Sequence, residues 1–361
     1  MKVFTTFFAL LFLLLSLVSC EFGVPIIKKK KEYRQVGFQS LNGWKHGNIV
    51  LGHRAFLATC ENLQNNKFPN NALFRENKSL WLAKCDLAKK YQNNPKAFFE
   101  QNFTPYLVEG ENGYNGTFTG YYEIELSGSR TPSERFRYPI YGLPTDKSLQ
   151  NKSRAEIEAG ALKGKAPILG YAESKGRLYF MQIQGTGRII EPNGNIIHFG
   201  YAGNNGYQYK SFATDVIEQG LIRRDELSAT KMMEWIDRNP QISFKELNKN
   251  PRFIFFEYRN NSPRGSLGVD LTPMGSIAVD PEFIPLGSPV WVETTYPPVG
   301  IKDLPRNLTF LVNAQDTGAA IKGAVRADIF FGSGEFAEKV SSGMKQQGRY
   351  FVLIPKELRV D

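Results

Sequence analysis

The chain has 361 residues, of which 42% are hydrophobic and 22% charged, and this composition excludes a disordered chain, a collagen and a protein with several membrane spans. Lysine and arginine number 45 against 35 aspartates and glutamates, and the resulting net charge of +10 favours an anionic partner such as nucleic acid, lipid or an acidic polymer. Three cysteines exclude a disulfide-framework fold, and three histidines leave little material for a metal site or a Ser-His-Asp triad, so we expect no metal and no cofactor.

The first predicted element is an apolar run at the N-terminus. A single positive charge precedes Val3–Val18, which is the pattern of a secretory signal peptide over residues 1–19. The run ends in Leu-Val-Ser-Cys, which resembles the lipobox of bacterial lipoproteins, so we expect Cys20 to become the lipidated first residue of the mature chain. An ordinary signal peptide with an incidental cysteine is the alternative. Residues 20–33 are then a tether, and Glu21 favours the periplasmic face of the outer membrane of a Gram-negative bacterium.

Helices are predicted next, within residues 54–110, where apolar residues recur at spacings of three and four. The segments Arg54–Leu63 and Ser79–Tyr91 each contain one cysteine, Cys60 and Cys85 respectively. In an oxidising compartment these two thiols could join the helices as a disulfide. Two buried thiols that pack as small hydrophobic groups are the alternative.

From Gly120 onward, short runs rich in tyrosine, phenylalanine and isoleucine are broken by glycine, proline and asparagine, which predicts strands. A helical segment over 211–238 interrupts them, and another helix is expected over 333–343. The order of helices, strands, helices and strands fits two mainly β domains with helical caps better than it fits a doubly wound sheet. The predicted strands cover 121–126, 137–141, 177–183, 188–190, 196–200, 253–258, 275–279, 289–293, 308–312, 328–331 and 349–354.

Two short motifs suggest chemistry but are incomplete. The strand over 308–312 leads into Asp316-Thr317-Gly318, the tripeptide of aspartic proteases, in which two such aspartates share a proton. Only one copy is present, so such an enzyme would have to dimerise, and it stays an alternative. The segment Gly185-Thr186-Gly187-Arg188 lacks the third glycine and the following helix of a dinucleotide fingerprint. No nucleic-acid-binding motif accompanies the positive charge, so nucleic acid is not an expected partner.

Three aspartates, Asp280, Asp316 and Asp328, each stand at the end of a predicted strand. The blocks that contain them resemble the 3D domain, a double-psi β-barrel of bacterial wall-active proteins. These blocks are GSIAVD at 275–280, IPLGSPV at 284–290, QDTG at 315–318, IKG at 321–323 and DIFFG at 328–332.

Further blocks upstream resemble the MltA family of lytic murein transglycosylases. They are TGYYE at 119–123, GSR at 128–130, YPIY at 138–141, FMQIQGTGR at 180–188, YAGNNG at 201–206 and NPRFIFF at 250–256. All of the blocks follow the family's order and cover about two thirds of the chain. The resemblance implies a mainly β fold with helices. Its double-psi β-barrel domain comprises residues 34–119, with a helical N-terminal part, and 253–361, and an MltA domain is inserted at 120–252.

The resemblance also implies a lytic transglycosylase that cleaves the β-1,4 bond between MurNAc and GlcNAc of peptidoglycan and forms 1,6-anhydroMurNAc. It places the single catalytic acid at Asp328, which would protonate the glycosidic oxygen and then take the proton of the sugar's own C6 hydroxyl. That role requires a raised pKa, and we expect Asp316 to raise it or to orient its neighbours. A peptidoglycan-binding lipoprotein without catalysis is the alternative, and the presence of both aspartates argues against it.

Sugar contacts are expected from amides, which bond hydroxyl and N-acetyl groups, and from aromatic rings, which pack on pyranose faces. Each candidate also has a purely structural explanation, such as strand alternation, a turn or a solvated lysine. Expected partners are the glycan strands of peptidoglycan, a membrane reached through the lipid anchor, and cell-wall enzyme complexes. The candidate substrate-binding residues are Tyr121, Tyr122, Gln182, Gln184, Gly185, Tyr201, Asn204, Asp280 and Lys322.

Overall fold

The computed structural model describes residues 32–110, 113–223, 228–260, 263–297, 306–318 and 320–359. These residues belong to one compact unit. The predicted signal peptide and Cys20 lie outside the described residues. Within the described ranges we find no helix whose length and hydrophobicity would let it span a lipid bilayer.

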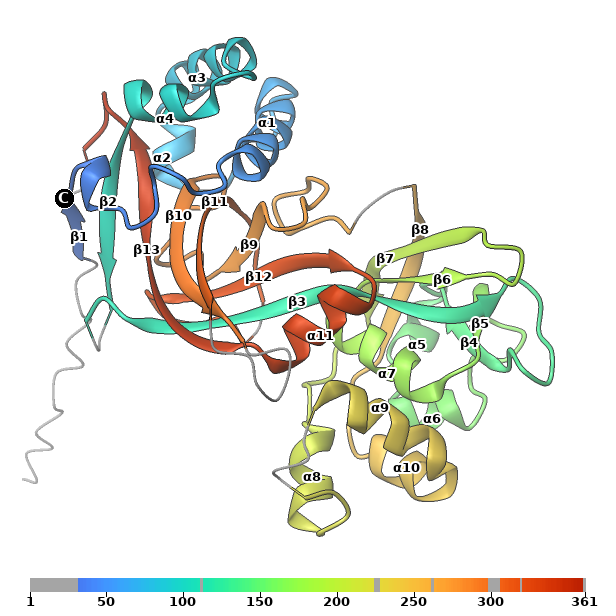
Figure 1. Cartoon of the computed structure of the whole chain (residues 1–361). Helices are drawn as coiled ribbons and strands as arrows, with labels where there is room; N and C mark the ends of the chain where they lie inside the picture. Colours follow the sequence, from blue (N-terminus) through green and yellow to red (C-terminus); the bar gives the residue numbers. More distant parts are fainter. Residues whose placement is uncertain are drawn as a thin grey trace, which may run out of the picture. The chain divides into compact units, whose positions relative to one another are not determined.

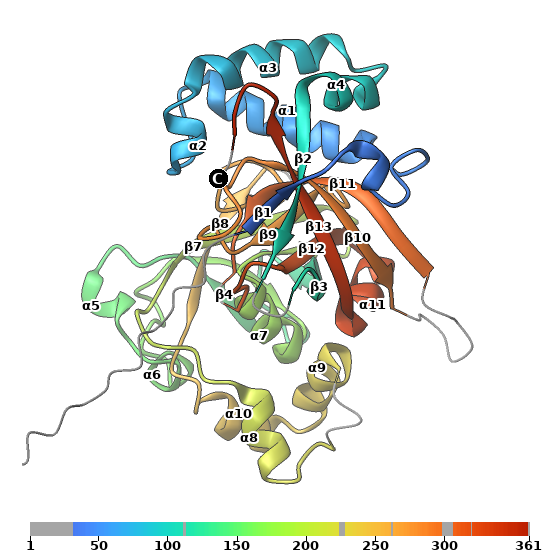
Figure 2. The same ribbon diagram turned by 90° about the vertical axis from the view of Figure 1, so that its left-hand side faces the viewer.

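The N-terminal part contains strand β1 (Glu32–Gln35), the 3-10 helix η1 (Phe38–Ser40) and the helices α1 (Val50–Gln64), α2 (Ala72–Arg75), α3 (Lys78–Lys90) and α4 (Pro95–Asn102). Asparagine side chains cap two of these helices, because Asn71 accepts from the Phe74 N–H and Asn94 from the Ala97 N–H. Figure 2 shows the helices α1 to α4 gathered on one side of the strands.

An aromatic core holds these helices against the strands. Phe56, Trp81 and Phe103 are completely buried, and the ring of Trp81 stacks on that of Phe74 with 3.9 Å between the centroids. Aromatic pairs of this kind add to the stabilisation that burial of their large surfaces supplies. The cluster also includes Leu311, from a central strand, so the helices share their core with the sheet.

Helices α1 and α3 are also joined covalently, because the sulfur atoms of Cys60 and Cys85 are 2.09 Å apart, as in a disulfide. For the sequence separation of 25 between them, chain entropy predicts a stabilisation of roughly 3 kcal/mol. We therefore expect the double variant Cys60→Ala, Cys85→Ala to lose about that free energy of unfolding in urea titrations. Reductant should lower the free energy of unfolding of the wild-type protein by the same amount and leave that of the variant unchanged. Equal urea midpoints for the two proteins would contradict a stabilising disulfide.

Six strands close into a ring within the described residues (Figure 1). Their order around the ring is β13, β10, β11, β9, β12 and β3, and the pairing of β3 with β13 closes it. Strand β9 runs parallel to β11, and β12 runs parallel to β3, whereas the other neighbours are antiparallel. The bounds are β2 (Phe103–Glu109), which extends the sheet beyond the ring, β3 (Gly116–Ser129), β9 (Ser276–Val279), β10 (Pro289–Tyr296), β11 (Arg306–Asp316), β12 (Arg326–Ser333) and β13 (Lys345–Pro355).

Strand β3 belongs to two groups of strands, because its second half leaves the ring and pairs with β5 and β6 (Figure 1). Strands β6, β7 and β8 continue this second group by antiparallel pairing. Its strands are β4 (Tyr138–Tyr141), β5 (Ile168–Ala172), β6 (Gly187–Ile190), β7 (Ile196–Asn204) and β8 (Ile254–Arg259). Its helices are α5 (Lys147–Gln150), α6 (Arg154–Glu158), α7 (Lys175–Gln184), α8 (Phe212–Glu218), α9 (Ala229–Arg238) and α10 (Pro240–Leu247).

The prediction of a strand over residues 177–183 is wrong, because this segment lies within helix α7. The Ser174 hydroxyl caps the helix by accepting from the Arg177 N–H, and Gly185 ends it with a φ of 77°. The alternating aromatic and polar residues suggested a strand, but Leu178 and Met181 also share a helical face. Gly176 lets this helix approach α9, since a Cβ there would lie 2.2 Å from the Met233 carbonyl oxygen.

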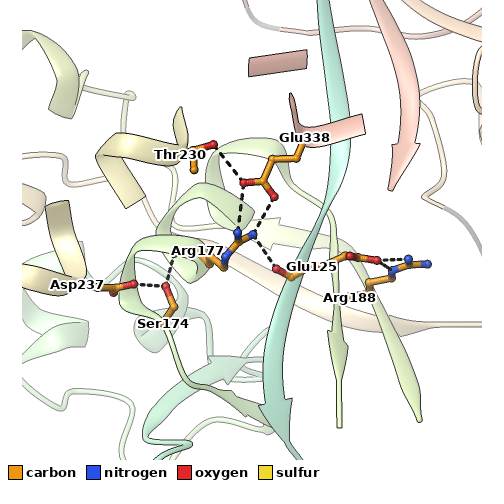
Figure 3. Close-up of polar contacts among 7 residues, drawn as sticks. All are labelled: Glu125, Ser174, Arg177, Arg188, Thr230, Asp237 and Glu338. Atoms are coloured by element: carbon orange, nitrogen blue, oxygen red, sulfur yellow. Dashed lines mark hydrogen bonds and ion pairs between the residues drawn. The ribbon is translucent and has the colours of Figure 1, made fainter. Parts of the chain in front are cut away.

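A partly buried ion pair connects the second group of elements to helix α11 (Glu335–Gly343), which follows β12. Both terminal nitrogens of Arg177 donate to the Glu338 carboxylate, at 3.1 and 3.3 Å, and the Thr230 hydroxyl donates to it at 3.2 Å. Arg177 also donates to the Glu125 carbonyl oxygen on β3 (Figure 3). Charge-assisted hydrogen bonds of this kind keep α7 in a defined position relative to β3 and α11.

Candidate active site

The strand order brings two carboxylates to one face of the ring. Ala278 of β9 pairs with Asp316 of β11 on one side and with Asp328 of β12 on the other. Residues in direct register point to the same face, and two strand spacings separate the backbones of the two aspartates by about 10 Å. A register shift before Asp316 places this residue at the end of its strand. The aspartates, twelve positions apart in the sequence, therefore face the same space.

Asp328 lies in a protected environment. The Thr119 hydroxyl, on the neighbouring strand β3, donates to its Oδ1 atom at 2.6 Å. Burial raises the pKa of Asp328 to about 6; the Thr119 hydrogen bond and the charge of Arg326 act in the opposite direction, and the charge of Asp316 raises it further. This side chain therefore holds a proton in mildly acidic solution, where an ordinary aspartate is ionised.

Asp316 lies among hydrogen-bond donors. Its Oδ1 atom accepts from the Ser266 N–H, the Ser266 hydroxyl and the Thr317 N–H, each at 2.9 Å. Its Oδ2 atom accepts from the Tyr121 hydroxyl, also at 2.9 Å. Four donors suit an ionised carboxylate, so the two aspartates have different environments and can play different roles.

Tyr121 connects the environments of the two aspartates. Burial, followed by the charges of Asp316 and Asp328, raises the pKa of Tyr121 well above its usual value, so its hydroxyl stays protonated and donates to Asp316. Strand alternation places Tyr121 and the neighbouring Tyr122 on opposite faces of β3. Only the first of these two tyrosines faces the aspartates.

A cavity of about 440 Å³ opens at the two aspartates. It shares part of its wall with a second cavity of about 380 Å³. The shared residues are Tyr121, Gln184, Gly185, Tyr201, Asp316 and Thr317. The two adjoining cavities share a wall that includes Asp316 and thus form one groove, and both are within the usual size range of ligand sites.

Several residues singled out in the sequence line this groove. Gln182, Gln184 and Gly185 reach it from the C-terminal end of α7, and Tyr201 reaches it from β7. Tyr201 remains 46% exposed, so much of this side chain is accessible from the groove. The amides and the aromatic ring thus lie beside Asp316 and Asp328, although sequence alone placed the glutamines on a strand.

Four other candidates do not line the larger cavity. Tyr122 is buried in the core, on the opposite face of β3. Asn204 instead contacts the Tyr201 hydroxyl and accepts from the Gly206 N–H. Asp280 is buried and accepts from the Gly323 N–H at 2.9 Å, and Lys322 lies 3.9 Å from the same carboxylate. The latter pair therefore organises the turn between β11 and β12, and the expectation that these four side chains contact sugar stays a prediction.

Four residues that contribute to the site could not be predicted from the sequence. Thr119 stands directly before the Gly120-Tyr121 pair, yet nothing in a lone threonine marks it as a partner of Asp328. Ser266 reaches Asp316 from a loop that is fifty positions away. Arg154 and Arg252 line the larger cavity, although only the latter falls in a recognised block. Among the described residues, no group of three or more histidines, cysteines and acidic residues is placed to hold a metal ion.

Two family models match the chain, in the order that the sequence blocks suggested. The MltA specific insert domain matches residues 117–257, and the 3D domain matches residues 275–354. The membrane-bound lytic murein transglycosylase A of Vibrio cholerae is 34% identical over 252 residues, which cover 68% of this chain and 67% of that protein. The protein of the same name from Escherichia coli K12 is 34% identical over 250 residues, or 68% of each chain.

Solved structures show the same fold. The crystal structure of MltA from Neisseria gonorrhoeae, in its monoclinic form, has a TM-score of 0.80 and 32% identity, and covers 91% of this chain and 94% of that chain. Escherichia coli MltA with bound chitohexaose has a TM-score of 0.71 and 28% identity, with coverage of 89% and 93%. The predicted fold class, strands with helices in a 3D domain and an inserted domain, is confirmed. The chain belongs to the MltA family of membrane-bound lytic murein transglycosylases.

Proposed function

We propose that this enzyme cleaves the β-1,4 bond between MurNAc and GlcNAc in peptidoglycan strands and releases products that end in 1,6-anhydroMurNAc. The observation that carries the proposal is the partly buried carboxyl group of Asp328, whose pKa burial raises to about 6, on the wall of a cavity that Asp316 also lines. The Escherichia coli relative with bound chitohexaose supports a glycan as the ligand, since the two folds correspond over most of their length.

One carboxyl group is sufficient for this reaction. Protonated Asp328 gives its proton to the glycosidic oxygen, and the bond between that oxygen and C1 of MurNAc breaks. The resulting carboxylate takes the proton of the C6 hydroxyl of the same sugar, and the C6 oxygen bonds to C1. No water is consumed, and Asp328 ends the cycle protonated as it began. A hydrolase would need a second carboxyl group that activates water or attacks C1.

Asp316 has a supporting role in the proposal. Its four hydrogen bonds keep a negative charge near the reacting sugar, where a positively charged transition state forms. The same charge also raises the pKa of Asp328. The proposal thus assigns proton transfer to Asp328 and charge stabilisation to Asp316.

Analysis of digested cell-wall sacculi by mass spectrometry tests this function. We expect muropeptides about 18 Da lighter than those that a hydrolase releases, because one water is not added. Hydrolysed products would overturn the reaction type. Binding to sacculi without any cleavage would instead point to a non-catalytic lipoprotein, and cleavage of proteins with inhibition by pepstatin would point to an aspartic protease.

The activity should decrease with rising pH, because the reaction needs the protonated form of Asp328. The first step needs the protonated form, so we expect turnover to fall as the pH rises through the pKa of about 6. The measurement is the initial rate on purified sacculi between pH 4 and pH 8 at constant ionic strength. Substrate binding should be measured at the same pH values, because weaker binding alone could cause the same fall in rate. A rate that is flat from pH 5 to pH 8 would contradict Asp328 as the proton donor.

We also propose that Cys20 carries the lipid that anchors the protein at the periplasmic face of the outer membrane. The support is the Leu-Val-Ser-Cys sequence at the end of the apolar run, together with the membrane-bound relatives. We expect Cys20→Ala to leave an uncleaved precursor that takes up no labelled palmitate, because the acylated thiol is missing. Cys60→Ala is the matched control and should keep the label. Palmitate incorporation that persists in Cys20→Ala would contradict the assignment.

A further inference from the structure

Two arginines line the larger cavity, and no reaction step described above uses them. Arg154, at the start of α6, and Arg252, just before β8, lie on its wall together with Asp316 and Asp328. Neither arginine lines the second cavity, whereas Asp316 lines both. The carboxylates come from strands of the ring, and the arginines come from the elements between β3 and β8. The larger cavity therefore carries carboxylates on one wall and guanidinium groups on another.

Arg154 forms the buried part of this positive wall. It is only 2% exposed, and its guanidinium lies over the rings of Tyr179 and Phe253, at 4.8 and 5.1 Å from their centroids. One terminal nitrogen donates to the Arg252 carbonyl oxygen at 2.8 Å. Its Nε atom has no hydrogen-bond partner within the described residues. Such an unfilled donor is costly in a protein without ligand, and it marks a place where a ligand or a water belongs.

Arg252 forms the accessible part of the wall. One of its terminal nitrogens donates to the Tyr207 carbonyl oxygen at 2.9 Å, and among the described residues no carboxylate forms an ion pair with it. Gln182, on the same cavity, is also buried, and its Oε1 atom lacks a partner in the described structure. Two residues that line this cavity thus each carry a polar atom without a partner among the described residues.

Around Arg154, the cationic side chains outnumber the acidic ones. Glu158 is the acidic neighbour of Arg154, with 3.9 Å between the charged atoms, but the Lys175 ammonium contacts the same carboxylate. Two cations thus share one anion, and Arg252 adds a third positive charge. An excess of positive charge on a partly closed cavity wall attracts an anionic group, and arginine prefers carboxylates because its fork of N–H groups matches their two oxygens.

We propose that Arg252, supported by Arg154, binds a carboxylate carried by the glycan, so that the cavity selects an acidic sugar chain over a neutral one of equal length. This inference rests on the proposed function, in which the ligand is peptidoglycan. Its muramic acid carries a lactyl group, whose carboxylate is free in peptide-free strands and continues as an acidic peptide in complete ones. In both cases the group that Arg252 binds is a carboxylate. Arg252 is therefore a specificity-determining residue.

Binding measured in the Asp328→Asn background, where the ligand stays intact, tests this proposal. The three probes are chitohexaose, a peptide-free hexasaccharide of alternating GlcNAc and MurNAc, and the same chain with its peptides. We expect Arg252→Gln to weaken binding of the acidic probes about tenfold, as for loss of one charge-assisted hydrogen bond, and to leave chitohexaose unaffected. Arg252→Lys should restore part of the difference. Arg238→Gln, a matched variant on an exposed arginine of α9, should change none of the three affinities.

The pattern across probes identifies the source of the carboxylate. A tenfold loss with the peptide-free chain assigns the lactyl carboxylate, whereas a loss confined to the peptide-bearing chain assigns a peptide carboxylate. Equal losses for neutral and acidic probes, or no loss at all, would overturn the proposal. If Arg252→Gln does not fold, the three affinities of the Asp328→Asn protein with both arginines intact provide the test. Equal affinity for chitohexaose and for the two acidic chains would then overturn the proposal. Anhydro products from sacculi are measured separately, so a failure here leaves the reaction type intact.

Discussion

Replacement of Asp328 by asparagine should reduce turnover on sacculi by at least about a thousandfold, since general acid–base catalysis typically contributes 10²–10⁴ and this residue serves both steps. Asparagine has nearly the same shape, and its side-chain oxygen can still accept from the Thr119 hydroxyl. The protein should therefore fold and bind glycan normally while it lacks the proton that the leaving oxygen requires.

Three measurements make this test specific. The melting temperature of Asp328→Asn should equal or exceed that of the wild-type protein, because burial penalises the charged carboxylate. Affinity for chitohexaose should stay within about twofold of the wild-type value. Asp86→Asn, an exposed substitution on α3, is the matched control and should keep full activity. More than a tenth of the wild-type rate in Asp328→Asn would assign the acid to another residue.

Replacement of Asp316 by asparagine should have the second largest effect, a loss of about ten- to a hundredfold in turnover, as expected when a charge near the transition state is removed. The charge of Asp316 helps to raise the pKa of Asp328, although burial is the larger cause. Without that charge the pKa of Asp328 should fall, so the whole pH profile should move to lower pH. The measurement is the rate on sacculi from pH 4 to pH 8.

The direction of this shift separates an electrostatic role from a structural one. Loss of the Tyr121 hydrogen bond alone is tested by Tyr121→Phe, which removes the hydroxyl but keeps the Asp316 charge. That variant should lower the rate without moving the profile to lower pH. If Asp316→Asn lowers the rate with an unchanged profile, the charge of Asp316 does not act on Asp328.

Much of the fold could be predicted from local sequence patterns. The helices around Cys60 and Cys85 follow from apolar spacing, and their observed bounds differ from the expected ones by a few residues. The strands that carry Asp316 and Asp328 follow from short aromatic and β-branched runs. Helix α7 shows the limit of this approach: its residues fit both periodicities, and the hydroxyl of Ser174 together with packing against α9 stabilises the helix.

The order of motifs along the chain was by itself enough to identify the family and to single out Asp328, because blocks such as DIFFG depend only on neighbouring residues. Tertiary structure alone decided which side chains meet at the site. Thr119 lies 209 positions from Asp328, and Ser266 lies 50 positions from Asp316. Strand register aligns both aspartates on Ala278 and places Tyr122 on the opposite face of its strand. Long-range packing brings Arg154 and Arg252 to one cavity. Such contacts leave no local pattern, since each partner is an ordinary residue until the fold brings the two together.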